Sequence, residues 1–213
     1  DDAGSYQARV EAARAHHLLG HTKKAEQLLR ANLDASALTP NSPEWRDSLF
    51  ALGRLMYDLE RYDDAVDALD EAVRRYPDDG AALYGKYMMA RSYHNGAQLL
   101  STRLRELRNE NEAKADRSRG LIQQKLESAH ATYLDVQQTI TLAGAADDDP
   151  LVRTLLRNCY MMQGSVLMEL RRFDEARQAF QNVITLYQND PVVLESFVQV
   201  ANCWRRLDQP AMA

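Results

Sequence analysis

The sequence is poor in residues that interrupt helices and in residues that crosslink a chain. It contains nine glycines, six prolines and two cysteines among 213 residues, and no segment sustains an alternation of apolar and polar residues. The chain is therefore expected to be almost entirely helical. Cys159 and Cys203 are too few for a disulfide scaffold, so we expect two buried thiols that act as small hydrophobes; a disulfide between them is the alternative.

A surplus of positive charge is also absent. The formal net charge is −5, which argues against nucleic acid as the main partner, because phosphate binding needs concentrated Lys and Arg. No stretch approaches the ~20 apolar residues of a membrane span, and no signal peptide is present. The sequence starts at Asp1 without a methionine and stops at Ala213 soon after a helical pattern. We therefore expect a fragment of a larger protein, and the sequence assigns no cellular compartment.

Motifs for catalysis and for metal or cofactor binding are missing as well. The sequence has no glycine-rich phosphate loop, no nucleophile elbow and no His-Glu-x-x-His. His16, His17 and His21 lie close together, but a glycine between them is expected to end their helix and no third ligand is evident. Glu127 and His130 have the spacing used in di-iron bundles, but such sites need a second copy. We predict no enzyme, and no catalytic, metal or cofactor site.

Residues 44–79 have the pattern of two amphipathic helices joined by a short turn. Apolar residues recur at the spacing of one helix face in the first half, at Leu49, Leu52, Met56 and Leu59. The second half has the matching face at Ala65, Leu69, Ala72 and Val73. Asp63 or Asp64 is expected to cap the second helix, and Pro77 to end it. Gly53 leaves a flat position where a neighbouring helix can approach.

This order of Leu-Gly, an aromatic-rich turn, alanine and proline resembles the tetratricopeptide repeat. One such unit cannot bury its own faces, so it implies copies beside it. The resemblance covers nearly the whole chain and implies an all-α fold, a right-handed α-solenoid of helix-turn-helix repeats forming a single domain over residues 1–213. The expected repeats are residues 5–36, 44–79, 80–143 and 150–189, with a half-repeat at 191–208. We expect the chain to come from a larger bacterial protein of this family.

The third expected repeat contains an insertion, at about 98–128, that the family does not have. This stretch is charged and contains no proline. Apolar residues recur on its two sides, at Leu100, Leu104, Leu107, Leu121, Ile122 and Leu126. We predict that both helices of the repeat run on and form one elongated helical hairpin. The alternative is a disordered loop of about 15 residues, although long structureless loops are uncommon.

The resemblance also implies a concave groove lined by the first helix of each repeat. The side chains expected there combine arginines with an apolar and aromatic floor: Arg14, His17, Phe50, Arg54, Tyr57, Tyr87, Arg91, His94, Met161 and Met168. Arginine and aromatic residues are enriched where few contacts carry binding energy, so an extended or helical peptide with acidic groups is the expected ligand. The alternative is that the arginines are only solvated and the aromatics pack between helices.

The predicted function is a scaffold that binds a protein or peptide in this groove, without a cofactor and without nucleic acid. The family's clamp for the C-terminal carboxylate of heat-shock chaperones is not matched, because Val10 and Phe50 stand where its lysine would be. A second hypothesis is self-association as a homodimer, through the hairpin or through the half-repeat, where Phe197, Trp204 and Leu207 would lack cover. A third is regulation of a catalytic domain that lies outside this sequence.

Overall fold

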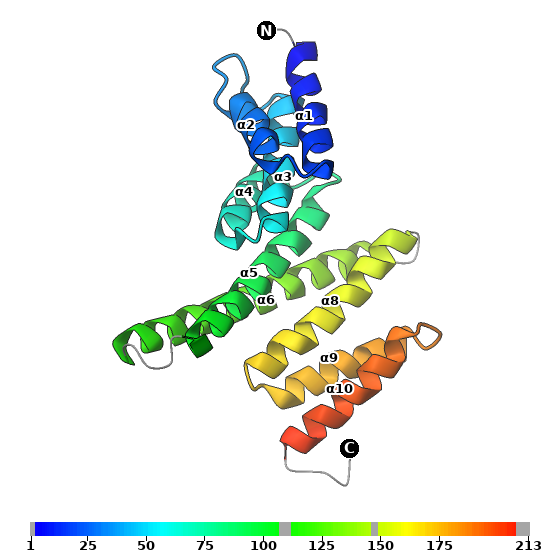
Figure 1. Cartoon of the computed structure of the whole chain (residues 1–213). Helices are drawn as coiled ribbons and strands as arrows, with labels where there is room; N and C mark the ends of the chain where they lie inside the picture. The colour runs from blue at the N-terminus through cyan, green and yellow to red at the C-terminus, as the bar shows by residue number, and fades with distance from the viewer. Residues whose placement is uncertain (1–2, 107–111, 146–148, 208–213) are drawn as a thin grey trace. The chain divides into compact units, whose positions relative to one another are not determined.

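The predicted all-α fold is confirmed by the structure, a computed structural model that describes residues 3–106, 112–145 and 149–207. Within these ranges it contains nine helices and no strand (Figure 1). The helices are α1 (Ala3–Leu18), α2 (Thr22–Leu33), α3 (Pro43–Asp58), α4 (Tyr62–Arg75), α5 (Ala82–Glu106), α6 (Glu112–Ala143), α8 (Pro150–Glu169), α9 (Phe173–Leu186) and α10 (Val192–Arg206). The chain divides into two compact units, unit 1 (Asp1–Gly96) and unit 2 (Ala97–Ala213), and each is described by itself.

The turns that follow α1, α3 and α8 share one geometry. Each contains a residue with a positive φ angle: Gly20 at 77°, Glu60 at 58° and Arg171 at 62°. The next amide then donates to the carbonyl five residues earlier, from His21 to His16 at 2.8 Å, from Arg61 to Met56 at 2.9 Å and from Arg172 to Leu167 at 2.9 Å. These bonds satisfy carbonyls that the end of a helix leaves without partners. The same turn therefore joins three helix pairs, although only one of the three positions is a glycine.

The start of α4 differs from the expectation. Its N-cap residue is Arg61, with no side-chain capping bond, so the prediction that Asp63 or Asp64 caps the helix is wrong. Both aspartates lie in the first turn of α4, where their negative charge interacts favourably with the positive end of the helix dipole. The start of α8 has a side-chain cap, because the Asp149 carboxylate accepts a 2.7 Å hydrogen bond from the Leu151 amide.

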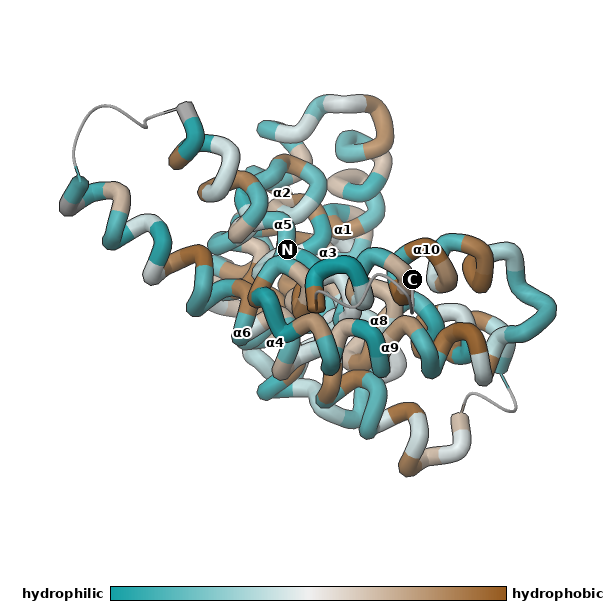
Figure 2. Tube along the Cα trace, turned by 90° about the horizontal axis from the view of Figure 1, so that it is seen from below, coloured by the Kyte–Doolittle hydropathy of each residue, from teal (hydrophilic) through white to brown (hydrophobic). Residues whose placement is uncertain are grey.

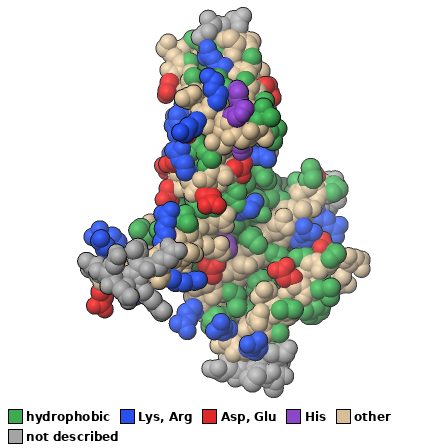
Figure 3. All heavy atoms as spheres, viewed as in Figure 1, with side chains coloured by type: hydrophobic (Ala, Val, Ile, Leu, Met, Phe, Trp, Pro, Cys, Tyr) green, Lys and Arg blue, Asp and Glu red, His purple; other side chains and the backbone are tan. Residues whose placement is uncertain are grey.

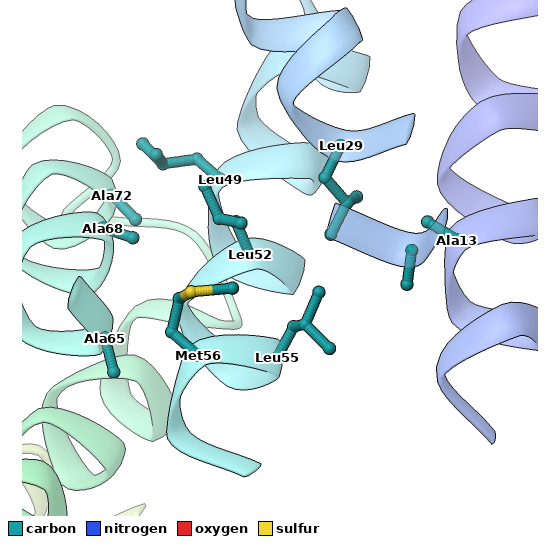
Figure 4. Close-up of a cluster of buried hydrophobic side chains, with 10 residues drawn as sticks. Ala13, Leu29, Leu49, Leu52, Leu55, Met56, Ala65, Ala68 and Ala72 are labelled. Atoms are coloured by element: carbon teal, nitrogen blue, oxygen red, sulfur yellow. The ribbon is translucent and has the colours of Figure 1, made fainter. Parts of the chain in front are cut away.

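The core of unit 1 is built on both sides of α3. Figure 4 shows Leu49, Leu52 and Met56 of α3 directed toward the alanines of α4, while Leu55 lies on the side of Leu29 and Ala13. Gly53 lies on the α4 side, and a Cβ atom there would stand 2.6 Å from Leu69 Cγ. The expected flat position is thus filled by a leucine from the second helix of the same pair.

The core of unit 2 is arranged in the same way around α8, which packs on both α6 and α9, while α9 packs on α10. A Cβ atom at Gly164 would lie 2.6 Å from the Phe180 ring, which matches the relation of Gly53 to Leu69. Cys159 and Cys203 are both buried and free, so the expectation of two buried thiols is confirmed. Burial raises the pKa of Cys159 to about 12 and that of Cys203 to about 11.

The described part of the expected insertion is helical. Helix α5 is 25 residues long and continues to Glu106, and α6 is 32 residues long and starts at Glu112. Residues 107–111, between the two helices of the predicted hairpin, lie outside the described residues. Leu126 is buried, whereas Leu121 is 43% exposed. Brown and teal alternate along these helices in Figure 2, as expected for helices with one covered and one exposed face.

Candidate functional site

A groove of about 730 Å³ opens in unit 1 between α1, α3 and the first residues of α5. We call it groove 1. These three helices are the first helices of the first three expected repeats. Second helices reach only its floor, through Ala25 and Leu29 of α2 and Leu69 of α4.

The floor of groove 1 is apolar, and apolar side chains also stand at its rim. Leu29, Leu55 and Leu69 are at most 2% exposed. Leu18 is 88% exposed and Tyr84 is 47% exposed, and both line the groove. A ligand that enters groove 1 would therefore remove exposed apolar surface from water, which is favourable at about 25 cal/mol per Å².

The charged side chains of groove 1 differ in their pairing. The Arg14 guanidinium forms an ion pair with Glu11 at 2.7 Å, and His17 Nε2 lies 3.2 Å from Asp58 Oδ2. Arg54 is exposed and has no hydrogen-bond or ion-pair partner within the described ranges. Its guanidinium remains free to bind an anionic group with its five N–H donors.

Four residues expected in the groove line it: Arg14, His17, Phe50 and Arg54. The expected row of arginines does not continue to Arg91, whose guanidinium carbon lies 4.9 Å from the Tyr57 ring centroid and 5.8 Å from that of Tyr87. Arg91 is therefore engaged by aromatic faces.

The other expected residues do not line groove 1. The Tyr57 hydroxyl accepts a 2.9 Å hydrogen bond from Asn95, and Tyr87 and His94 are 7% and 4% exposed. Met161 and Met168 belong to unit 2, where Met161 is 6% exposed and Met168 packs against the same buried cluster. These side chains pack between helices and are not exposed on the surface of groove 1.

The expected groove residues leave out other side chains that line groove 1, among them Leu18, Asp58, Tyr84 and Met88. Leu18 is the last residue of α1 and Asp58 the last of α3. The sequence did carry a usable signal for Leu18 and Tyr84, because each is a large apolar side chain at a helix end that the repeat pattern does not use for its core.

Other classes of site have little support in the structure. No group of three or more His, Cys, Asp or Glu residues that could hold a metal ion occurs in the part of the chain that the structure describes. Over the same residues, none of the helices combines the length and the apolar character that crossing a bilayer requires.

Comparison with known proteins supports the repeat interpretation. Two tetratricopeptide repeat family models match the chain, one at residues 50–86 and one at residues 158–190. These segments fall on α3 with α4 and on α8 with α9, the two pairs that share the glycine contact and the turn geometry. No curated protein matches the chain in sequence.

Solved structures with the same fold are distant in sequence. MamA of AMB-1 is 18% identical, with a TM-score of 0.61 over 99% of this chain and 86% of MamA. A Podosopora anserina kinesin light chain protein with nearly identical TPR-like repeats is 16% identical, with a TM-score of 0.61 over 99% of this chain and 90% of that one. BtubC from P. vanneervenii is 16% identical, with a TM-score of 0.58 over 99% and 85%. At these identities the likeness concerns the fold alone.

Proposed function

We propose that this chain, which is a tetratricopeptide-repeat protein, acts as a protein-interaction scaffold and binds a partner segment in groove 1. The observation that carries the proposal is the free guanidinium of Arg54 beside an apolar floor and rim. Ligand-binding clefts combine these two features, an apolar surface that contributes affinity and a few polar groups that fix orientation.

The dimensions of groove 1 suit a short segment. Its lining on α3 runs from Phe50 to Asp58, which is about 12 Å at the 1.5 Å rise of a helix. An extended peptide rises about 3.3 Å per residue, so roughly four residues would lie in the groove.

The charges of groove 1 favour an acidic segment. Glu11 already neutralises Arg14, and the Asp58 carboxylate lies against the His17 imidazole. Arg54 is therefore the described groove arginine that has no carboxylate partner. A carboxylate on the ligand could pair with its guanidinium in a bidentate manner. An aliphatic or aromatic residue next to that carboxylate would contact Leu18 and Tyr84. The proposed ligand is therefore a segment with an acidic residue beside a large apolar one.

A library of random 12-residue peptides displayed on phage tests this proposal. Selection on the chain should enrich peptides with an Asp or Glu beside a large apolar residue, and Arg54→Ala should weaken their binding about tenfold, as expected for the loss of a charged hydrogen bond. Arg105→Ala is the matched control, because Arg105 is exposed and lies outside groove 1. Equal binding to the wild type and Arg54→Ala would refute the proposal.

Self-association is a second candidate, and the surface of α10 favours it. Leu194, Phe197 and Val198 are 73%, 55% and 59% exposed, and apolar side chains are visible in Figure 3 in the region that α10 occupies in Figure 1. Trp204, by contrast, is covered by Arg177, whose guanidinium carbon lies 4.6 Å from the ring centroid. Sedimentation velocity of the wild type and Phe197→Ser tests this candidate. A wild-type protein that stays monomeric at about 100 µM would exclude a dimer of micromolar affinity.

A further inference from the structure

Unit 2 contains a second groove, of about 620 Å³, whose lining differs from that of groove 1. We call it groove 2. One wall is α6, the other is α9, and α8 contributes the residues between them. Its polar lining is dominated by side-chain amides from all three helices: Gln137, Gln138, Gln163, Gln178 and Asn182.

The inner amides are held in place by one another. Gln137 Nε2 donates to Gln163 Oε1 at 2.9 Å, and Gln163 Nε2 lies 3.4 Å from His130 Nδ1. Gln137 and Gln163 are only 5% and 8% exposed. Because the Gln163 amide nitrogen can only donate, His130 presents an unprotonated Nδ1 to it. Burial, followed by the nearby Arg172, lowers the pKa of His130, which keeps this side of the groove uncharged at neutral pH.

The outer amides keep hydrogen-bonding groups for a ligand. On α9, Gln178 Nε2 donates to Asn182 Oδ1 at 3.2 Å, which leaves the Gln178 carbonyl oxygen and the Asn182 amide nitrogen available. On α6, Gln138 is exposed and has no partner within the described residues. The two walls thus present both donors and acceptors across the groove.

The charge of groove 2 is confined to one end. Arg172 bridges Glu127 at 3.3 Å and Glu175 at 2.5 Å, so its guanidinium is already paired with two carboxylates. The excess charge there is negative. Unlike groove 1, groove 2 offers no uncompensated cation among its described lining residues.

We propose that groove 2 binds an extended peptide segment without acidic residues, through hydrogen bonds between the wall amides and the main chain of the segment. A side-chain amide carries the same donor and acceptor as a peptide group, so a row of amides can pair with successive main-chain groups. The groove follows α6 from His130 to Leu142, about 18 Å at the rise of a helix, which accommodates roughly five extended residues. Leu134 and Leu142, 37% and 88% exposed, add apolar contacts.

The same random 12-residue library, displayed on phage, tests this second site, with the double variant Gln138→Leu/Gln178→Leu used to sort the selected peptides. Both residues are exposed, so the variant should fold as the wild type does. We expect a class of selected peptides that lacks Asp and Glu and binds this variant about tenfold more weakly, because two hydrogen bonds to the peptide main chain are lost. Gln124→Leu, an exposed change on α6 outside the groove, should bind these peptides as the wild type does.

The outcomes separate groove 2 from groove 1. Peptides of the groove 2 class should bind Arg54→Ala normally, and peptides of the groove 1 class should bind Gln138→Leu/Gln178→Leu normally. The proposal is overturned if no selected peptide responds to the double variant, or if the responding peptides are acidic. Either result would leave the proposal for groove 1 unaffected.

Discussion

A methyl group added at Gly53 provides a sharp test of the helix contact in unit 1. The Cβ of Gly53→Ala would lie 2.6 Å from Leu69 Cγ and 2.7 Å from Leu69 Cδ2, about 1 Å inside the optimal separation of two carbon atoms. Leu69 is 2% exposed, and Cγ is the branch point of its side chain, so a rotation at the tip does not relieve the overlap. Overpacking of this kind costs about 1–3 kcal/mol.

An opposing gain must be subtracted from this cost. Replacing glycine by alanine inside a helix stabilises it by about 1 kcal/mol. The net change for Gly53→Ala is then a loss of about 0–2 kcal/mol in the free energy of unfolding. In a Leu69→Ala background, which itself costs about 2–5 kcal/mol, the overlap is gone and Gly53→Ala should stabilise by about 1 kcal/mol.

Urea unfolding of the four variants measures this double-mutant cycle. A Trp204→Phe background leaves Trp45 of α3 as the single tryptophan, so that its fluorescence follows unit 1. The expected coupling energy between residues 53 and 69 is about 1–3 kcal/mol. If Gly53→Ala stabilises both backgrounds equally, the glycine is not required by the contact with Leu69 and this explanation of the repeat pattern fails.

Three further predictions concern buried polar groups and a stacked arginine. Asn32→Ala should cost about 1–3 kcal/mol in urea unfolding, because the fully buried Asn32 amide donates to the Tyr6 carbonyl at 2.9 Å and to Ser48 Oγ at 3.0 Å; a change below 0.5 kcal/mol would contradict this. Arg91→Ala should destabilise unit 1 by about 0.5–1 kcal/mol through loss of its two ring contacts, whereas Arg54→Ala should stay within about 0.5 kcal/mol; equal effects would show that the stacking contributes nothing. The pKa of His130 is lowered in the folded protein, so the unfolded chain binds more protons than the folded one as pH falls below about 6.5. The free energy of unfolding of unit 2 should therefore decrease from that pH downward. His130→Gln should make this decrease smaller, as measured by Trp204 fluorescence in a Trp45→Phe background.

The fold could be read from the sequence because the helix pairs depend on local patterns. The predicted repeats 44–79 and 150–189 contain the two pairs that the family models also match. Gly53 and Gly164 in these pairs both face a large side chain of the paired helix. In the second helix of the third repeat, the apolar residues at helical spacing are all at most 1% exposed: Ala129, Tyr133, Val136 and Ile140. Periodicity of this kind records which face is buried, and burial is what holds the pairs together.

The candidate site was harder to predict, because position in a repeat does not fix where a long side chain lies. Arg54 and Arg91 occupy matching positions, yet Arg54 is free in groove 1 and Arg91 lies over Tyr57 and Tyr87. Tyr87 lies on α5 with Arg91, but Tyr57 comes from the neighbouring helix α3, and the pattern within one helix does not contain that second contact. Groove 2 was missed for a related reason, since amides on α6, α8 and α9 become a row only after the three helices pack.

Charge reversal at Arg54 tests the proposed function most directly. Titration calorimetry would compare an acidic peptide selected on groove 1, and the same peptide with its Asp or Glu changed to Lys, against the wild type and Arg54→Glu. We expect the acidic peptide to bind the wild type at least tenfold more tightly than it binds Arg54→Glu, in keeping with the loss of about 1.4 kcal/mol or more. The lysine peptide should reverse this preference. Unchanged affinities across the four combinations would contradict it.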